Sequence, residues 1–176
     1  MSAADWLTLT LTPGFTRARS SELFACYGDA TAICAASRTA LKQAGLSEES
    51  VSAIKSPDQA QLKLGLSWLE NPQHHLVHWQ DPRYPAMLRE TGQGPMCLFV
   101  AGDPDVLALP QIAIVGSRNA TPGGIETARN FAAHLARTGF VITSGLALGI
   151  DAAAHDGALH AGGLSIAVEG TGLDQE

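Results

Sequence analysis

The amino-acid sequence predicts a protein of the α/β class, with a parallel βαβαβ sheet in its second half and a small helical domain in its first half. Three observations lead to this prediction. Short apolar runs begin near residues 112, 140 and 164, each bounded by turn residues. Two segments with helical periodicity lie between these runs. The first 72 residues contain short helical segments separated by glycine, proline and polar residues.

The predicted helical domain covers residues 1–72. Thr16 can cap a helix that runs to about residue 27, Gly45 is a natural helix stop, and Ser47 can cap the next helix. The last helix is predicted to begin at Ser56-Pro57-Asp58-Gln59, with serine as the N-cap and glutamine reaching back from the third helical position. The apolar residues that share one face of this helix are Leu62, Leu66 and Leu69.

Residues 73–110 form a predicted connector with structure of its own. The segments 75–79 and 97–101 are apolar enough to be strands. A turn at 81–85 leads into a short helix near 86–90, and Gly102-Asp103-Pro104 turns the chain again.

Residues 111–176 hold the predicted parallel sheet. Its strands are expected at 112–115, 140–143 and 164–168, with helices near 124–138 and 150–160 between them. Right-handed connections should place consecutive strands side by side. Three strands leave at least one open edge, so we expect either that another part of the chain covers it or that the chain is a fragment. The residues of the first helix expected to face inward are Ala128, Phe131, Ala132 and Leu135.

The charge balance counts against a protein that coats duplex DNA with a broad basic surface. The chain of 176 residues has a formal net charge of -6, whereas such proteins are usually basic. From Gln111 onward there are six acidic residues, three arginines and no lysine. This balance leaves room for a narrow anion site built largely from backbone.

Other features indicate a cytoplasmic protein without a metal or cofactor. Three cysteines form no CxxC pair, which favours a reducing compartment. No basic leader with an apolar run, and no apolar stretch near 18 residues, is present, so neither a signal peptide nor a membrane helix is expected. His74, His75 and His78 lack a completing cysteine or acid and are interpreted as surface histidines rather than a zinc site.

The two turns after the first and second predicted strands are the candidate functional site. The first contains Gly116, Ser117 and Arg118, and the second runs from Ser144 to Asp151. Helix N-termini at the carboxyl ends of strands favour an anion, and the arginine fork matches phosphate. Asp151 complements the helix dipole and can organise the loop rather than touch the ligand. The alternative is that these glycines only permit tight turns.

Several common phosphate and catalytic sites do not fit these turns. Dinucleotide binding needs G-x-G-x-x-G after the first strand and an acid after the second, and both are missing. No Gly-Lys-Ser/Thr triplet occurs, and Ser117 and Ser144 do not sit in G-x-S-x-G. Asp151 and His155, one helical turn apart, are interpreted as a helix-surface contact rather than a catalytic dyad.

Several motifs along the chain resemble those of the DprA/Smf family, the DNA-processing proteins of natural transformation. The resemblance covers essentially the whole chain, including the Pro13-Gly14 turn of the helical start. The motifs that carry it are Asp81-Pro82-Arg83-Tyr84-Pro85, Leu98-Phe99-Val100-Ala101-Gly102, Ile114-Val115-Gly116-Ser117-Arg118, Thr143–His155 and Gly170-Thr171-Gly172-Leu173-Asp174.

The resemblance implies a Rossmann-like domain after a SAM-like or helix-hairpin-helix-like domain. It further implies a single-stranded DNA-binding protein, without catalysis, that protects incoming DNA and loads the RecA recombinase. A homodimer is implied for the full-length protein. The residues that would contact DNA by this resemblance are Gly116, Ser117, Arg118, Ser144, Gly145, Leu146, Ala147, Gly149 and Asp151.

Three departures from the family pattern affect this expectation. Thr121-Pro122-Gly123-Gly124 lacks a tyrosine that the family often shows, and Glu169 stands where an uncharged residue is usual. Family members also continue well beyond residue 176, so weak DNA binding is expected of this piece alone. The rival hypothesis is an enzyme that cleaves nucleoside monophosphates, a phosphoribohydrolase, although Pro122-Gly123-Gly124-Ile125-Glu126 only partly mimics its site.

Overall fold

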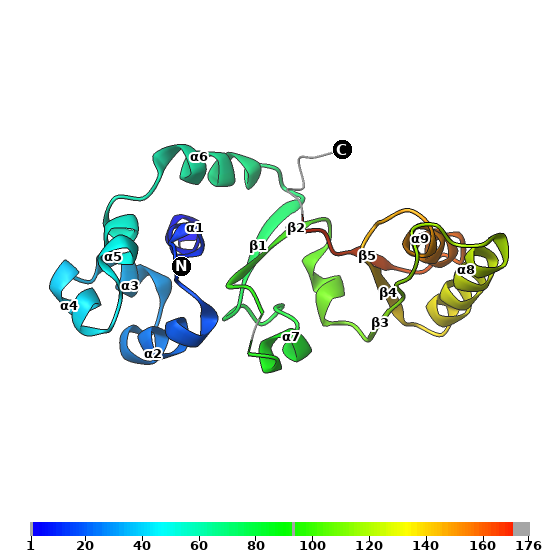
Figure 1. Ribbon diagram of the computed structural model, residues 1–176, viewed down its shortest axis with the longest axis horizontal. Coiled ribbons are helices and arrows are strands. Elements are labelled where there is room, and N and C mark those ends of the chain that lie inside the picture. Colours follow the sequence, from blue (N-terminus) through cyan, green and yellow to red (C-terminus); the bar gives the residue numbers. More distant parts are fainter. Residues whose placement is uncertain (1, 93, 171–176) are drawn as a thin grey trace. The chain divides into compact units, whose positions relative to one another are not determined.

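The computed structural model describes residues 2–92 and 94–170 of the chain, with the side chains of 17–19 left aside (Figure 1). The chain divides into two compact units, Met1–Pro104 and Asp105–Glu176. Most of the segment predicted as a connector, 73–110, falls in the first unit. The three-part division of the chain into domains stays a prediction.

The first unit begins with six helices. Four of them start at a side chain that accepts a backbone N–H: Asp29, Ser37, Ser47 and Asp58 cap α3 to α6. Trp6, Leu9, Ile33 and other apolar side chains fill the core between these helices. The helices are α1 (Ala3–Leu11), α2 (Arg17–Tyr27), α3 (Ala30–Ala35), α4 (Arg38–Gln43), α5 (Glu48–Lys55) and α6 (Gln59–Trp68).

The predicted start of α6 is wrong by two residues. Asp58, not Ser56, is the N-cap, and its Oδ1 accepts from the N–H groups of Ala60 and Gln61 at 2.9 and 3.1 Å. A carboxylate here satisfies two free N–H groups and also complements the helix dipole, which a serine hydroxyl does not. Gln59 donates to the Pro57 carbonyl instead of reaching back to an N-cap.

A two-stranded antiparallel sheet completes the first unit. It joins β1 (His74–His78) to β2 (Cys97–Ala101), with α7 (Ala86–Glu90) between them. His78 stacks on Trp6 with ring centroids 4.2 Å apart, and His74 stacks on Trp68 at 4.0 Å. These two histidines therefore pack against aromatic rings, and within the described residues no group of metal-ligating side chains gathers around them.

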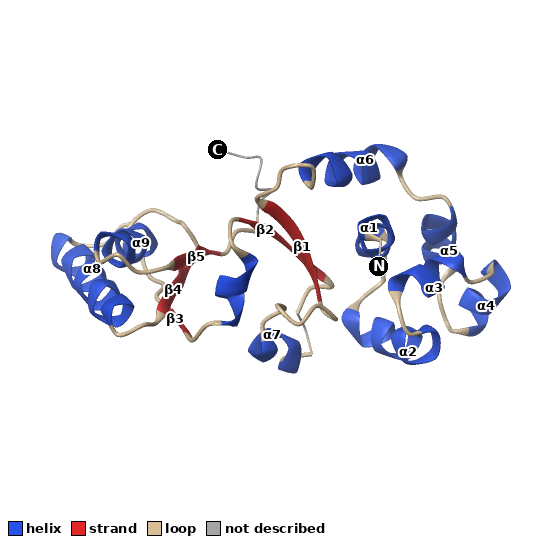
Figure 2. Ribbon diagram, turned by 180° about the vertical axis from the view of Figure 1, so that it is seen from behind, coloured by secondary structure: helices blue, strands red, loops and turns tan. Residues whose placement is uncertain are grey.

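The second unit has the predicted βαβαβ order. Its strands β3 (Gln111–Ala113), β4 (Val141–Ser144) and β5 (Ser165–Ala167) pair in parallel in the order β3-β4-β5. The connecting helices α8 (Pro122–Arg137) and α9 (Ile150–His160) lie on the same side of this sheet (Figure 1, Figure 2). The α/β class with a parallel sheet is confirmed.

Helices α8 and α9 meet along a seam of small residues. Ala132, Ala136, Ala154 and Ala158 pack with Ile142 of β4 in one buried cluster. The prediction that Phe131 faces inward is wrong, since 63% of its surface is exposed. Phe131 lies about 100° around the helix from Ala132, and the close approach of the two helices leaves space for methyl groups but not for a ring.

None of the described helices is both long and apolar enough to cross a membrane.

Candidate nucleic-acid interface

The two predicted turns lie together at the carboxyl end of the parallel sheet. Strand pairing continues into them, because Ile114 N–H donates to the Thr143 carbonyl at 3.0 Å and Val168 N–H donates to the Ser144 carbonyl at 2.8 Å. The Ile150 N–H, at the start of α9, donates to the Ser117 carbonyl at 3.2 Å. The structure therefore brings both turns into one surface, which we call the rim (residues 115–119 and 145–151).

Asp151 joins the two turns of the rim. Its side chain is buried, with 6% of the residue exposed. One carboxylate oxygen accepts from the Gly116 N–H at 3.2 Å, and the other accepts from the Gly145 N–H at 3.1 Å. Each turn therefore donates one backbone N–H to the same carboxylate.

The two serines of the predicted turns, Ser117 and Ser144, have different surroundings. Ser144 is buried, and its hydroxyl donates to the Ile114 carbonyl at 2.6 Å, so it connects β4 to the end of β3. Ser117 is exposed, and its hydroxyl accepts from the Asn119 N–H at 3.1 Å. Ser144 thus contributes to the packing of the sheet, while Ser117 faces solvent.

Arg118 is the exposed cation of the rim. No ion pair to it is formed by residues 2–92 or 94–170. Over the same part of the chain, the N–H groups of Ser117, Arg118 and Leu146 have no hydrogen-bond partner. A guanidinium together with free backbone N–H groups is a donor set that suits phosphate oxygens.

The second turn holds two unusual backbone conformations. Leu146 has φ of 56° although it carries a side chain, and 55% of that residue is exposed. Such a conformation costs about 1–3 kcal/mol, and strained residues of this kind cluster at functional sites. Gly149 has φ of 86° and ψ of -121°, and a Cβ built there would lie 2.2 Å from the Ser117 carbonyl oxygen. Only glycine fits this position. The Ala147 carbonyl accepts from the Ala152 N–H at 3.0 Å.

The interpretation of Asp151 and His155 as a helix-surface contact is wrong, because both are buried. His155 Nδ1 lies 2.7 Å from the Ser165 hydroxyl, which itself donates to the Ile142 carbonyl at 2.8 Å. Because that hydroxyl proton is used, Nδ1 is the donor to Ser165. Burial lowers the pKa of His155, and the nearby Asp151 carboxylate opposes this in part. His155 therefore links α9 to β5 as a neutral imidazole.

This environment predicts an acid-sensitive second unit. Because the folded pKa of His155 is lowered, the unfolded chain takes up the proton more readily, and stability is lost as the pH falls through the unfolded value of about 6.5. One proton gives a slope of at most about 1.4 kcal/mol per pH unit. We expect the urea-unfolding midpoint of the His155→Gln variant to depend less on pH than that of the unaltered protein, when both are measured as the pH falls through about 6.5. His134→Gln, at an exposed position on α8, is the control, and an equal effect of both variants would contradict the prediction.

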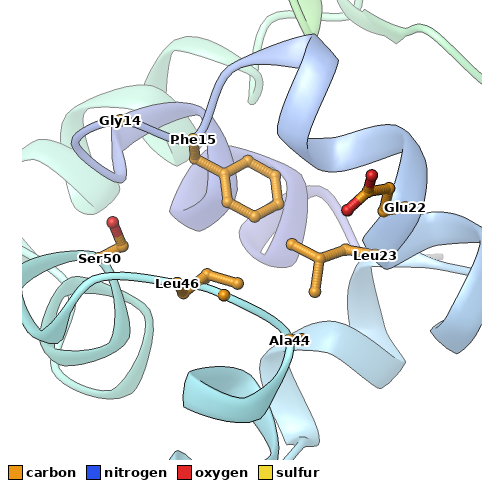
Figure 3. A pocket seen from close by; sticks show the side chains of 8 residues that line it. Gly14, Phe15, Glu22, Leu23, Ala44, Leu46 and Ser50 are labelled. Atoms are coloured by element: carbon orange, nitrogen blue, oxygen red, sulfur yellow. The ribbon is translucent and has the colours of Figure 1, made fainter.

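A pocket of about 180 Å³ lies in the first unit, remote in sequence from the rim (Figure 3). Phe15, Leu23 and Leu46 form its apolar wall, and the Glu22 carboxylate lies beside them. None of the predicted site residues lines it.

Comparison with known proteins shows the family to which this chain belongs. The family described as DNA recombination-mediator protein A matches residues 75–176, which include both turns of the rim. The chain belongs to this family.

Individual members of the DNA recombination-mediator protein A family are similar over much of the chain. Protein Smf of Escherichia coli is 42% identical over 134 residues, which is 76% of this chain and 36% of that protein. The DNA processing protein DprA of Streptococcus pneumoniae is 46% identical over 94 residues, covering 53% and 33% of the two chains. The X-ray structure of DprA from Streptococcus pneumoniae superposes with a TM-score of 0.76 at 30% identity, covering 100% of this chain and 61% of that one.

The chain thus spans about a third of the length of these two curated family members. The resemblance to the DprA/Smf family, inferred from motifs, is confirmed.

Proposed function

We propose that the rim binds the phosphate backbone of single-stranded DNA, and that the protein acts in DNA recombination during natural transformation. In this role it protects incoming strands and delivers them to the RecA recombinase, without catalysis of its own. The observation that carries the proposal is the position of Arg118, exposed beside free backbone N–H groups, in a chain of the DNA recombination-mediator protein A family.

The electrostatics of the chain favour this narrow mode of binding. With a net charge of -6, the protein repels a polyanion at long range, so contact must come from local donors. Backbone N–H groups, together with the Arg118 guanidinium, supply such donors without a basic surface. Each phosphate neutralised on a single strand should contribute about -0.7 to the slope of log affinity against log salt.

Replacing Arg118 by glutamine is expected to weaken binding of a fluorescent oligothymidine about tenfold and to reduce the magnitude of the salt slope by about 0.7, because one phosphate contact is lost. The measurement is fluorescence anisotropy over a series of salt concentrations. Arg137→Gln is the matched control, since Arg137 is also exposed but lies in the last turn of α8, at the end of that helix away from Thr121 and the rim.

Equal losses for the Arg118 and Arg137 variants would show non-specific attraction and would contradict a site at the rim. An affinity that does not change with salt would contradict phosphate contacts altogether.

The rival function, hydrolysis of nucleoside monophosphates, depends on the segment Pro122-Gly123-Gly124-Ile125-Glu126. This segment is the first turn of α8, where Thr121 accepts from the Gly124 N–H at 3.2 Å. Incubation of the protein with a nucleoside monophosphate distinguishes the two functions, because released base would overturn the DNA-binding proposal.

Two partners follow from the proposed function. RecA would receive the bound strand, and a second copy of the protein would form a homodimer in the full-length form. The support for both partners is family membership alone. The chain covers 61% of the solved DprA chain from Streptococcus pneumoniae.

A further inference from the structure

We infer that Asp151 is a positioning residue that acts as an internal anion: its carboxylate occupies the inner donors of the rim and so directs DNA phosphate to the outer ones. The statement that DNA phosphate is directed to the outer donors rests on the proposed function. The statement that one carboxylate fixes the geometry of both turns concerns the folded protein alone and does not depend on DNA binding.

The geometry distinguishes inner and outer donors. The N–H groups of Gly116 and Gly145 point to the two oxygens of Asp151, at 3.2 and 3.1 Å. A phosphate needs the same kind of donor, so these two groups are not available to it while the carboxylate is in place. The N–H groups of Ser117, Arg118 and Leu146 are among the donors that remain in the described part of the chain, together with the Arg118 guanidinium.

The carboxylate is held in this position by burial and close packing. Asp151 is 6% exposed, and a Cβ on Gly145 would lie 3.0 Å from its Oδ2. On the other side, a Cβ on Gly116 would lie 2.7 Å from the Ile150 side chain. The glycines therefore let both turns approach the start of α9 closely enough for their N–H groups to reach one carboxylate.

No arginine or lysine forms an ion pair with Asp151 among the described residues. Its negative charge is balanced instead by the two backbone N–H dipoles and by the N-terminus of the eleven-residue helix α9. This is the environment that an anion-binding site offers to a ligand. Here a side chain of the chain itself fills it, which sets the spacing between the turn that carries Arg118 and the turn that carries Leu146.

The test compares Asp151→Ala with Glu126→Ala. Both variants remove one negative charge from the second unit, but Glu126 is exposed on α8 and, among the described residues, forms no ion pair with the rim. In Asp151→Ala we expect faster hydrogen exchange at the Gly116 and Gly145 amides, measured by NMR. We also expect sodium formate, compared with sodium chloride at equal ionic strength, to raise the melting temperature of this variant, because formate can replace the missing carboxylate. Glu126→Ala and the unaltered protein should show neither effect.

Oligothymidine binding tests the directing role. Asp151→Ala should bind about tenfold more weakly although it is less negative, because the outer donors lose their spacing, and formate should restore part of the affinity. Binding as tight as that of Glu126→Ala would overturn the directing role, and unchanged exchange at both glycine amides would overturn the internal anion. If the unaltered protein binds no DNA, the proposed function fails, while exchange and formate rescue still decide whether Asp151 holds the rim.

Discussion

Replacement of Gly149 by alanine is expected to destabilise the second unit by about 2–6 kcal/mol and to reduce DNA binding with it. The backbone at φ 86° and ψ -121° costs a residue with a side chain about 1–3 kcal/mol. The added Cβ would also lie 2.2 Å from the Ser117 carbonyl oxygen and 2.7 Å from that of Arg118, so the first turn must move. Overpacking of this kind costs a further amount of about 1–3 kcal/mol. Urea unfolding, with hydrogen exchange to localise the loss, measures the effect.

Gly162→Ala is the matched control for this change. Gly162 also has a positive φ, of 73°, but among the described residues no atom beyond its two chain neighbours lies within 4 Å of a Cβ built there. Its replacement therefore carries backbone strain alone, about 1 kcal/mol. If the two variants lost equal stability and bound DNA equally well, the close contact between the second turn and residues 117–118 would not exist in solution.

Replacement of Gly157 by alanine should also destabilise the second unit, by about 2–3 kcal/mol, although glycine-to-alanine changes inside helices usually stabilise by up to about 1 kcal/mol. A Cβ at Gly157 would lie 2.2 Å from the Arg129 carbonyl oxygen of α8. Because backbone cannot rotate away as a side chain can, α8 and α9 must separate, and the alanine seam between them loses contact.

Gly123→Ala is the control, because its expected effect on stability has the opposite sign to that of Gly157→Ala. Gly123 lies in the first turn of α8, with no atom within 4 Å of an added Cβ, so Gly123→Ala should leave the urea midpoint unchanged or raise it. A stabilised Gly157→Ala variant would contradict the close crossing of the two helices.

The positions of the elements follow closely from local sequence signals. Residues predicted to start or stop helices, such as Ser47 and Gly45, do so in the structure, and α9 has its predicted bounds. These signals operate within a few residues: a side-chain oxygen reaches an N–H three positions away, and glycine accepts a φ that other residues avoid. The start of α6 shows the limit, because Ser56 has the expected pattern of a cap, whereas the Asp58 carboxylate, two residues later, accepts the N–H groups of the first turn.

Burial depended on contacts that periodicity does not contain. From the apolar spacing of α8, both Phe131 and Ala132 are predicted to face inward. The tertiary structure separated them, because Gly157 of α9 allows an approach too close for a ring. The burial of Asp151 and His155 cannot be predicted from the sequence for the same reason: their hydrogen-bond partners, Gly116 and Ser165, lie elsewhere in the chain.

The order of helices and strands, the parallel sheet and the two turns that end β3 and β4 can therefore be predicted from the amino-acid sequence, since each depends on short-range patterns and on right-handed connections. The sequence also carries the motifs by which the family is recognised. Which backbone N–H groups of those turns already have an acceptor depends on contacts between distant parts of the chain. Gly116 and Asp151 are 35 residues apart, and their hydrogen bond exists only because strand pairing and helix packing bring the two turns to one carboxylate.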